Sequence, residues 1–264
     1  MRAADLGVRR GKVNQGPELC YDTSFRRVSR PGLHPRERVM ATQLKIEFVS
    51  DISCPWCVVG LRNMEAALAA IGDEVEADIR FEPFELNPGM PREGMDRADY
   101  FTSKYRISAE EAERRGGEIR ARAEEAGFTM NTGQGFRVYN TFDAHRLLEW
   151  AMEEGKQRAL KHALFTAYFT EARNMGDHET LVEIAQSAGL DGDRAREILA
   201  NDEYSGHVRQ AQSYQRGRGV QSVPTIIVNG EYVINGGQPP EIFEKAFRHI
   251  ASEVARDQLA AEPA

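Results

Sequence analysis

The fold is decided by residues 45–57, which read KIEFVSDISCPWC. The first six residues alternate apolar and polar side chains, as a half-buried strand does, and apolar residues recur at helical spacing from Pro55 onward. Proline suits the first position of a helix because its missing N–H would have no partner there, so Cys54 is the predicted N-cap. The segment therefore predicts a strand that turns directly into a helix, with Cys54 at the junction.

The two cysteines of this junction are spaced for redox chemistry. At the helix N-terminus, the sulfur of Cys54 is expected to face unpaired amide donors and the positive end of the helix dipole, which favours the thiolate. Cys57 lies one turn further on, where it can attack a mixed disulfide that Cys54 has formed with a substrate. Cys54 is thus the predicted exposed nucleophile and Cys57 the predicted resolving thiol. The alternative interpretations are two small core residues or half of a metal site. Zinc would need two more ligands at a recognisable spacing, so we predict no metal site.

Length, charge and cysteine content exclude several classes of protein. The chain has 264 residues, 41% of them hydrophobic, which fits one large domain or one domain carrying an insertion. Residues 1–39 hold nine Lys/Arg and four Asp/Glu, a net charge of +5; because the whole chain carries −7, the rest carries −12. This acidic body argues against nucleic acid as a partner. No apolar run approaches a membrane span and no secretory signal begins the chain, so we expect a cytoplasmic protein without a membrane partner.

The N-terminal stretch is set apart from the rest. Residues 1–39 show neither strand nor helix periodicity and contain few large apolar groups, which predicts a disordered tail. An alternative is an over-extended start, with translation beginning at Met40. An organellar presequence is less well supported, because such segments are poor in acidic residues. Cys20 stands alone in this stretch, which favours working chemistry for the CPWC pair over an extracellular disulfide framework.

A second strand and a later hairpin extend the α/β pattern. Residues 75–81 alternate strictly between apolar and polar side chains, which predicts a strand parallel to the first and joined to it through the helix. Residues 225–228 and 231–234 flank an Asn-Gly pair at 229–230 that favours a tight hairpin, and two prolines at 239–240 start a final helix.

Between these two parts, the sequence carries only helix signals. The helix starts predicted there are Ser108, Thr141, Asp177 and Asp191. We therefore predict an α/β domain with an all-helical insertion between its second and third strands. The predicted ranges are 40–90 and 220–258 for the α/β domain, 91–219 for the insertion and 259–264 for a tail.

This order of elements resembles the thioredoxin fold, and the position of the insertion resembles the DsbA family. Three stretches are similar to its FrnE-like branch: SDISCPWC at 50–57, NTFDAHR at 140–146 and GGQP at 236–239. The resemblance covers about residues 44–255. Related proteins include kappa-class glutathione transferases and 2-hydroxychromene-2-carboxylate isomerases, in which a serine that activates glutathione usually replaces the first cysteine. Cysteine at both positions favours thiol–disulfide exchange here.

The resemblance also assigns a role to Val223 and Pro224. It implies that this loop lies across from the CxxC motif and that the bond between the two residues is cis. The backbone N–H and C=O of Val223 would then pair with an extended substrate or with glutathione. Such pairing is indifferent to substrate sequence, which suits an enzyme with many partners. Without the resemblance, Pro224 would be an ordinary proline at the start of a strand.

Three further residues are candidates for the site. Asp51 is either the acceptor of the proton that Cys57 must lose or an ordinary turn acid ahead of a helix. His145 lies on a predicted amphipathic helix, where a half-buried core histidine is the simpler interpretation; the resemblance implies a wall residue that bonds thiolate or ligand. Trp56 lies between the cysteines, where it is hard to bury, so it is a candidate contact for an apolar substrate.

The sequence thus predicts a DsbA-like thiol–disulfide oxidoreductase that reduces, isomerises or oxidises disulfides. Its partners would be a disulfide-containing protein or a small-molecule thiol, and the chain would be a monomer or homodimer. No dissociable cofactor is required, because the dithiol is itself the redox centre; glutathione is a candidate co-substrate. One alternative is a glutathione-dependent isomerase or transferase of a small aromatic substrate, whose activity survives loss of Cys57. Another is a holdase-like binding module that uses the helical insertion and needs neither thiol.

Overall fold

A five-stranded sheet with the strand order β1-β7-β6-β2-β3 forms the centre of the α/β part. The structure is a computed structural model and describes residues 8–10, 41–133 and 135–261. Strands β2 (Thr42–Ser50) and β3 (Val75–Pro83) are parallel neighbours in the sheet. The chain runs from β2 to β3 by way of α1 (Pro55–Ile71) and a short 3-10 turn, η2 (Gly72–Glu74). Strand β6 (Thr225–Val228) pairs antiparallel with β2 and with β7 (Tyr232–Asn235). The predicted strand, helix and hairpin order is therefore confirmed.

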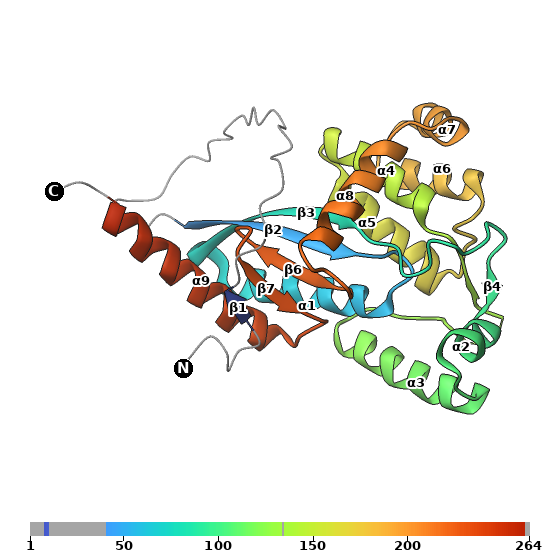
Figure 1. Cartoon of the computed structure of the whole chain (residues 1–264), viewed down its shortest axis with the longest axis horizontal. Helices are drawn as coiled ribbons and strands as arrows, with labels where there is room; N and C mark the ends of the chain where they lie inside the picture. Colours follow the sequence, from blue (N-terminus) through green and yellow to red (C-terminus); the bar gives the residue numbers. More distant parts are fainter. Residues whose placement is uncertain (1–7, 11–40, 134, 262–264) are drawn as a thin grey trace.

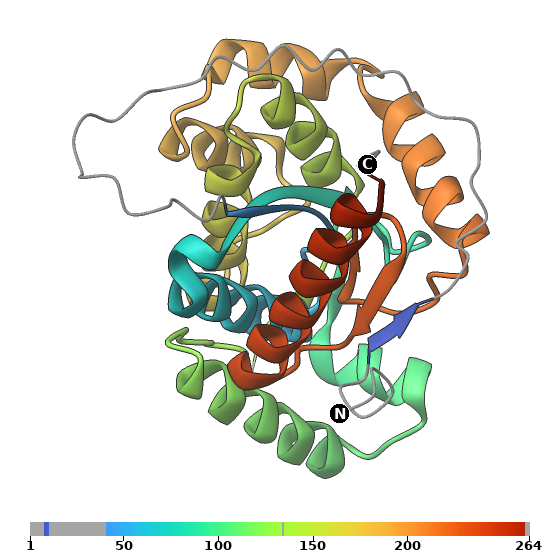
Figure 2. The same cartoon turned by 90° about the vertical axis from the view of Figure 1, so that its left-hand side faces the viewer.

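The hairpin and the last helix complete this part. Asn229 and Gly230 both have positive φ, 50° and 73°, as the turn between β6 and β7 requires. Helix α9 (Pro240–Ala261) follows and packs beside α1; Figure 2 shows it crossing in front of the sheet. The sequence placed the end of this region at residue 258, but the helix continues to Ala261. The residues at its end are Gln, Leu and Ala, which favour helix.

The insertion consists of helices that gather at the end of the sheet toward which β2 points (Figure 1). Its elements are α2 (Arg97–Tyr105), α3 (Ala109–Glu125), α4 (Phe142–Glu153), α5 (Gln157–Phe165), a π-helical turn η3 (Thr166–Thr170), α6 (His178–Ser187), α7 (Gly192–Ala200) and α8 (Ser205–Gly217). Two-residue strands, β4 (Met95–Asp96) and β5 (Arg137–Val138), pair within it. The predicted starts at Ser108, Asp177 and Asp191 are N-caps whose side chains accept backbone N–H groups, and Thr141 is the N-cap of α4.

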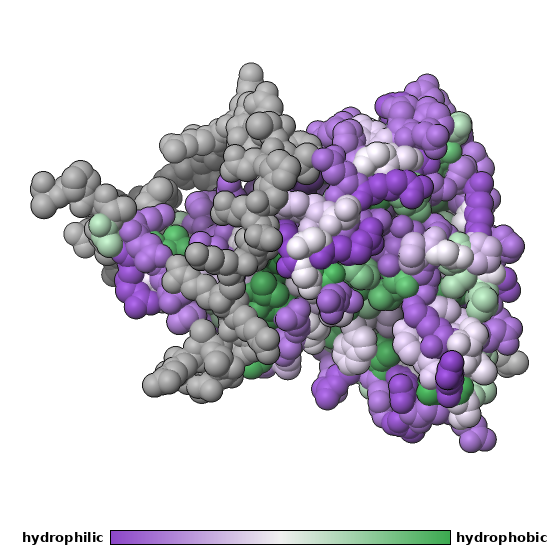
Figure 3. Space-filling model, in the orientation of Figure 1, coloured by the Kyte–Doolittle hydropathy of each residue, from purple (hydrophilic) through white to green (hydrophobic). Residues whose placement is uncertain are grey.

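One apolar core joins the two parts. The same cluster of buried side chains contains Ile250 of α9, Cys57 of α1, Phe165 of α5 and Ile184 of α6. On the surface shown in Figure 3, which is mostly hydrophilic, apolar residues group between the sheet and the insertion helices. The insertion is therefore packed directly against the element that carries the cysteines.

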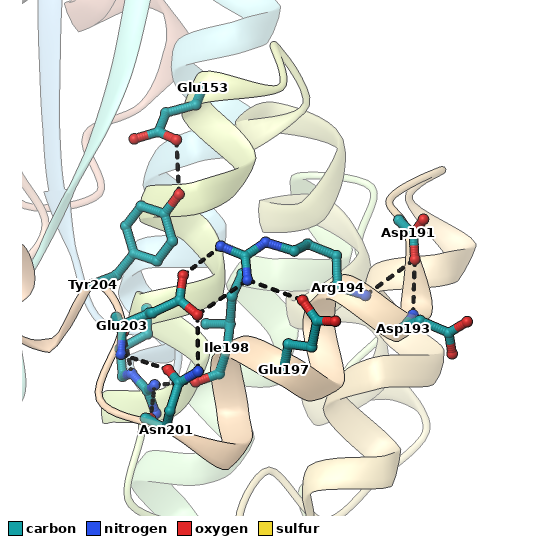
Figure 4. Close-up of polar contacts among 10 residues, drawn as sticks. Glu153, Asp191, Asp193, Arg194, Glu197, Ile198, Asn201, Glu203 and Tyr204 are labelled. Carbon is teal, nitrogen blue, oxygen red and sulfur yellow. Dashed lines mark hydrogen bonds and ion pairs between the residues drawn. The ribbon is translucent and has the colours of Figure 1, made fainter.

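Polar contacts fix the turn between α7 and α8 (Figure 4). The guanidinium of Arg194 donates to both carboxylate oxygens of Glu203, and the hydroxyl of Tyr204 donates to Glu153 at 2.7 Å. Tyr204 has a positive φ of 60° and is the N-cap of α8. Since Glu153 ends α4, these bonds tie the start of α8 to α4. The far end of α8 leads directly into the loop before β6.

The N-terminal stretch differs from its prediction at one place. Residues Val8–Arg10 form β1, which pairs antiparallel with β7 over Tyr232–Ile234. For these residues the prediction of a disordered tail is wrong. The outer edge of β7 presents backbone N–H and C=O groups that can pair with any extended segment, whatever the side chains of that segment. The side-chain pattern of residues 8–10 therefore did not predict a strand. The remainder of the predicted tail lies outside the described residues, and so does Met40, the alternative start.

Candidate active site

The cysteines of the CPWC motif lie at the N-terminus of α1, as predicted. Cys54 is the N-cap, with extended backbone at φ −93° and ψ 110°, and Pro55 follows at the first helical position. The N–H of Cys57 donates to the carbonyl of Cys54 at 3.0 Å. Both cysteines are free thiols, and they approach each other to 3.5 Å. The two sulfurs are therefore close enough for one to attack a disulfide that the other has formed.

The two thiols differ in accessibility. Cys57 is fully buried, whereas 5% of Cys54 is exposed. The prediction of an exposed Cys54 is thus wrong in degree: only a small part of the residue reaches solvent. The loop before β6 covers it, because the Cys54 thiol donates a hydrogen bond to the Val223 carbonyl at an Sγ–O distance of 3.6 Å. The sequence led us to expect that the Cys54 sulfur faces the free amides of α1, but the Cys54 side chain makes no capping hydrogen bond to them.

The Val223–Pro224 loop lies against α1 at a point where α1 has no side chain. The bond between Val223 and Pro224 is cis. A Cβ on Gly60 would lie 3.0 Å from Cγ of Pro224 and 3.2 Å from Cα of Gly237, closer than side chains normally pack. Gly60 therefore permits the loop to approach Cys54. Sequence reasoning missed this residue; the only signal was a glycine inside a helix, one turn after Cys57.

Burial raises the pKa of the Cys57 thiol well above its usual range, and the neighbouring Cys54 raises it further. Cys57 is therefore protonated at neutral pH until something stabilises its thiolate. Of the two thiols, only Cys54 has surface open to solvent. The roles of nucleophile and resolving thiol that the sequence assigned to the two residues stay predictions.

Asp51 lies just before the motif and is held by a dense set of donors. Its carboxylate accepts from the N–H of Leu86 at 2.6 Å, the N–H of Ser53 at 3.1 Å and the hydroxyl of Ser53 at 3.0 Å. Nε2 of His145 lies 3.7 Å from its Oδ1 and donates to the carbonyl of Phe84 at 3.0 Å. Burial opposes ionisation of Asp51, but the bond and charge of His145 and the backbone N–H groups outweigh it, so the pKa is lowered.

These contacts bear on the alternatives left open for Asp51 and His145. A carboxyl group with a lowered pKa is a weaker base, which disfavours Asp51 as acceptor of the Cys57 proton. The geometry favours an anchor that joins the CPWC turn to the segment after β3. His145 is 2% exposed rather than half-buried, and its ring contacts Asp51 and Phe84. Its position under the turn comes from α4, which packs against β3.

Trp56 points outward, as predicted. With 40% of its surface exposed, it is one of two large apolar side chains that stand free among the described residues; the other is Tyr105 at the end of α2, 47% exposed. A pocket begins at Ser53 and Pro55, on either side of Cys54. Five of its thirteen lining residues are aromatic side chains of the insertion: Tyr100, Phe101, Phe136, Tyr168 and Phe169. Apolar surface therefore lies next to the CPWC turn.

Lys161 of α5 is a charged residue that sequence reasoning missed. Its side chain is completely buried, and Nζ lies 4.8 Å from the ring centroid of Phe165. Within the described part of the chain Nζ has no hydrogen-bond partner. The available signal was a lysine among apolar residues, next to Leu160 and with Leu164 one turn on. Such a position usually holds a side chain without charge.

Neither a metal-binding cluster nor a membrane-spanning helix occurs in the described ranges. Residues 8–10, 41–133 and 135–261 contain no group of three His, Cys, Asp or Glu side chains placed to hold a metal ion. Over the same ranges, no helix has the length and apolar character needed to cross a bilayer.

Comparison with known proteins places this site in a family. The chain is 30% identical over 203 residues to the uncharacterized protein YwbO of Bacillus subtilis (strain 168), an overlap that covers 76% of this chain and 94% of YwbO. A probable DsbA oxidoreductase from Streptomyces coelicolor has a similar crystal structure, with 34% identity, a TM-score of 0.76 and coverage of 80% of this chain and 91% of the other.

A more distant structure shares the fold alone. The cytosolic disulfide reductase DsbM from Pseudomonas aeruginosa, solved with GSH, is 15% identical with a TM-score of 0.55, over 80% of this chain and 99% of the other. The family model of the DSBA-like thioredoxin domain matches residues 45–248, which include the dithiol, the insertion and the Val223–Pro224 loop. The chain therefore belongs to the DSBA-like thioredoxin domain family.

Proposed function

We propose that this protein exchanges disulfides through a mixed-disulfide intermediate. The Cys54 sulfur attacks a substrate disulfide RS–SR, which forms Cys54–S–S–R and releases one thiolate. The Cys57 sulfur then attacks Cys54, which breaks the bond to R, closes the Cys54–Cys57 disulfide and releases the second thiol. The substrate gains two electrons and the dithiol loses two; the same steps in reverse oxidise a substrate dithiol.

One observation carries this proposal. Two free thiols lie within 3.5 Å of each other at a helix N-terminus, and only Cys54 has any surface open to solvent. The two sequence neighbours of Cys54, Ser53 and Pro55, line a pocket, which a purely structural pair of core cysteines would not require. The arrangement suits a nucleophile, Cys54, that captures the substrate as a mixed disulfide, and a second thiol, Cys57, that releases it.

The surroundings support a substrate that binds by its backbone and by apolar contact. The Val223 carbonyl lies beside Cys54 and is the natural acceptor for a backbone N–H of an extended peptide. Trp56 and the aromatic walls of the pocket offer apolar surface on the other side. We assign binding roles to Val223, Pro224 and Trp56, and anchoring roles to Asp51 and His145.

Reduction with glutathione in the cytoplasm is the direction we propose. The cytosol keeps dithiols reduced, so a reduced CPWC pair would act there as a donor of electrons. A protein of the same fold is described as a cytosolic disulfide reductase and was solved with GSH. Glutathione would then return the Cys54–Cys57 disulfide to the dithiol, and no dissociable cofactor is needed.

The test is reduction of insulin disulfides with glutathione as the reductant. Cys54→Ser should abolish activity, because no mixed disulfide can form. Cys57→Ser should lower turnover at least a hundredfold and accumulate a mixed disulfide with substrate, visible as a mass increase that dithiothreitol removes. Cys20→Ser is the matched cysteine control and should match wild type. Full activity of Cys54→Ser, or normal turnover of Cys57→Ser, would contradict the assigned roles.

The pocket favours one second candidate, a glutathione-dependent isomerase or transferase of a small aromatic substrate. Aromatic side chains line part of the pocket that begins at Ser53 and Pro55, on either side of Cys54, and offer a surface on which a small aromatic molecule could stack. This function needs Cys54 to hold or activate glutathione but does not need Cys57. Isomerisation that survives Cys57→Ser, together with no insulin reduction by wild type, would favour it over disulfide exchange. Suppression of aggregation by a variant without both thiols would instead indicate a holdase.

A further inference from the structure

Lys161 occupies an unusual position for a charged side chain. It is completely buried, on a helix of the insertion, in the apolar core that also contains Cys57. A buried ammonium without hydrogen bonds costs several kcal/mol of folding free energy. The rings of Phe165 and Phe81, 4.8 Å and 5.9 Å from Nζ, offset only part of that cost through cation–π attraction. A methionine would fill the same space without the penalty.

Helix α5 lies beside α1, since Arg158 and His162 of α5 contact Glu65 of α1 at 2.7 Å and 2.9 Å. The Lys161 ammonium is close enough to the Cys57 thiol, the Asp51 carboxylate and the Cys54 thiol for their charges to act on it, in decreasing order. Conversely, the positive charge of Lys161 favours ionisation of Cys57, against the burial and the Cys54 neighbour that oppose it.

Charged groups on the elements packed around α5 have other partners. His145 contacts Phe84 and Asp51, Glu82 and Glu149 pair with Arg80, His178 pairs with Asp143, and His162 of α5 itself pairs with Glu65. Glu179 and Glu183 of α6 pair with Arg196 and Arg173, and the Tyr168 hydroxyl donates to the Arg137 carbonyl. Among these neighbours, only the two thiols and Asp51 act on Lys161.

We propose that Lys161 is a positioning residue that stabilises the Cys57 thiolate as it attacks the mixed disulfide. This proposal rests on the proposed disulfide exchange. In the resolving step, Cys57 loses its proton and its sulfur forms a bond to the sulfur of Cys54. The Cys54–S–R bond breaks, and the departing RS⁻ takes up a proton to leave as RSH. Lys161 remains an ammonium throughout, so no further reactant is required.

The pH dependence of resolution follows from the state of Lys161. Burial lowers the pKa of Lys161 to about 8, so its ammonium is present below about pH 8 and is lost as the pH rises through that value. In the wild-type protein, the resolving rate should therefore rise with pH and flatten above about pH 8. Without the ammonium, it should keep rising in proportion to hydroxide.

Rapid mixing of the reduced protein with dithiobis(nitrobenzoate) separates the two steps. In a Cys20→Ser background, which removes the third thiol of the chain, each attack releases one coloured thiolate, so the first phase reports Cys54 and the second phase reports Cys57. Lys161→Met, which matches lysine in length, should slow the second phase at pH 7 at least tenfold and change the first phase by less than about threefold. Lys161→Arg, with its permanent charge, should restore most of the second-phase rate and remove the flattening near pH 8.

Controls make each outcome decisive. Lys156→Met removes a lysine at the start of the same helix, where its ammonium bonds the Gly189 carbonyl, and should leave both phases unchanged. A second phase as fast in Lys161→Met as in the wild-type protein at pH 7 would overturn the role of Lys161. So would a wild-type second phase that rises in proportion to hydroxide straight through pH 8, a measurement that needs no variant. Absence of the first phase in wild type would instead overturn the proposed disulfide exchange.

Discussion

Glu82 predicts an unusual pH dependence of stability. This residue lies near the end of β3, where it is 7% exposed. Burial, together with the negative charges of Glu47 and Glu149, raises its pKa from 4.5 to about 7, although Arg80 at 2.7 Å opposes the shift. The folded protein therefore holds a proton on Glu82 in a range where the unfolded chain has lost it.

The sign and size of the effect follow from linkage. Because the folded state binds more protons between the two pKa values, the contribution of Glu82 to the free energy of unfolding falls as the pH rises from about 4.5 through 7. Each unit of pKa difference corresponds to about 1.4 kcal/mol. Between pH 5 and pH 8, the ionisation of Glu82 should therefore cost about 2–3 kcal/mol of stability.

Glu82→Gln tests this, since glutamine resembles the protonated acid at every pH. Urea unfolding of wild type and variant at pH 5 and pH 8 gives four free energies of unfolding. Relative to wild type, the variant should gain about 2–3 kcal/mol on going from pH 5 to pH 8. Glu76→Gln, on the exposed side of the same strand, is the control for the loss of one carboxylate. A variant that is less stable than wild type by the same amount at both pH values would refute the reasoning.

Two further predictions concern the site. Gly60→Ala should slow formation of the mixed disulfide about tenfold, because the new Cβ would lie 3.0 Å from Pro224 and must displace that loop; the first phase of thiolate release measures it. The control is Gly117→Ala, whose new Cβ would lie 3.8 Å from its nearest neighbour, the guanidinium of Arg120. It should keep the wild-type rate of mixed-disulfide formation and gain up to about 1 kcal/mol of stability. Equal rates of mixed-disulfide formation in both variants would show that the Pro224 loop has room for the added methyl group. Asp51→Asn should lower the free energy of unfolding at pH 7 by about 2 kcal/mol through weaker acceptance from Leu86. Since the Asp51 pKa is lowered, this loss should shrink as the pH falls below the usual value of 3.8, and a loss that does not change with pH would count against a role for the negative charge.

Much of the site was predictable from short stretches of sequence. Strand alternation followed by a proline at the first helical position located Cys54 as the N-cap, and the spacing of the motif put Cys57 one turn further on. The approach of Val223 to Cys54 was expected from family resemblance, not from local pattern. The exposure of Trp56 followed from its place in the loop.

The sequence by itself determined the order of β2, α1, β3, β6, β7 and α9, several helix caps and the place of the dithiol, because caps and periodicity act within a few residues. Tertiary structure alone decided that Cys57 and His145 are buried, that Gly60 admits the Pro224 loop and that Lys161 is buried without a hydrogen bond among the described residues. Burial and electrostatic environment depend on which distant segments pack together, here α1 with a helix about a hundred residues later. No local pattern records which groups will share that low-dielectric interior.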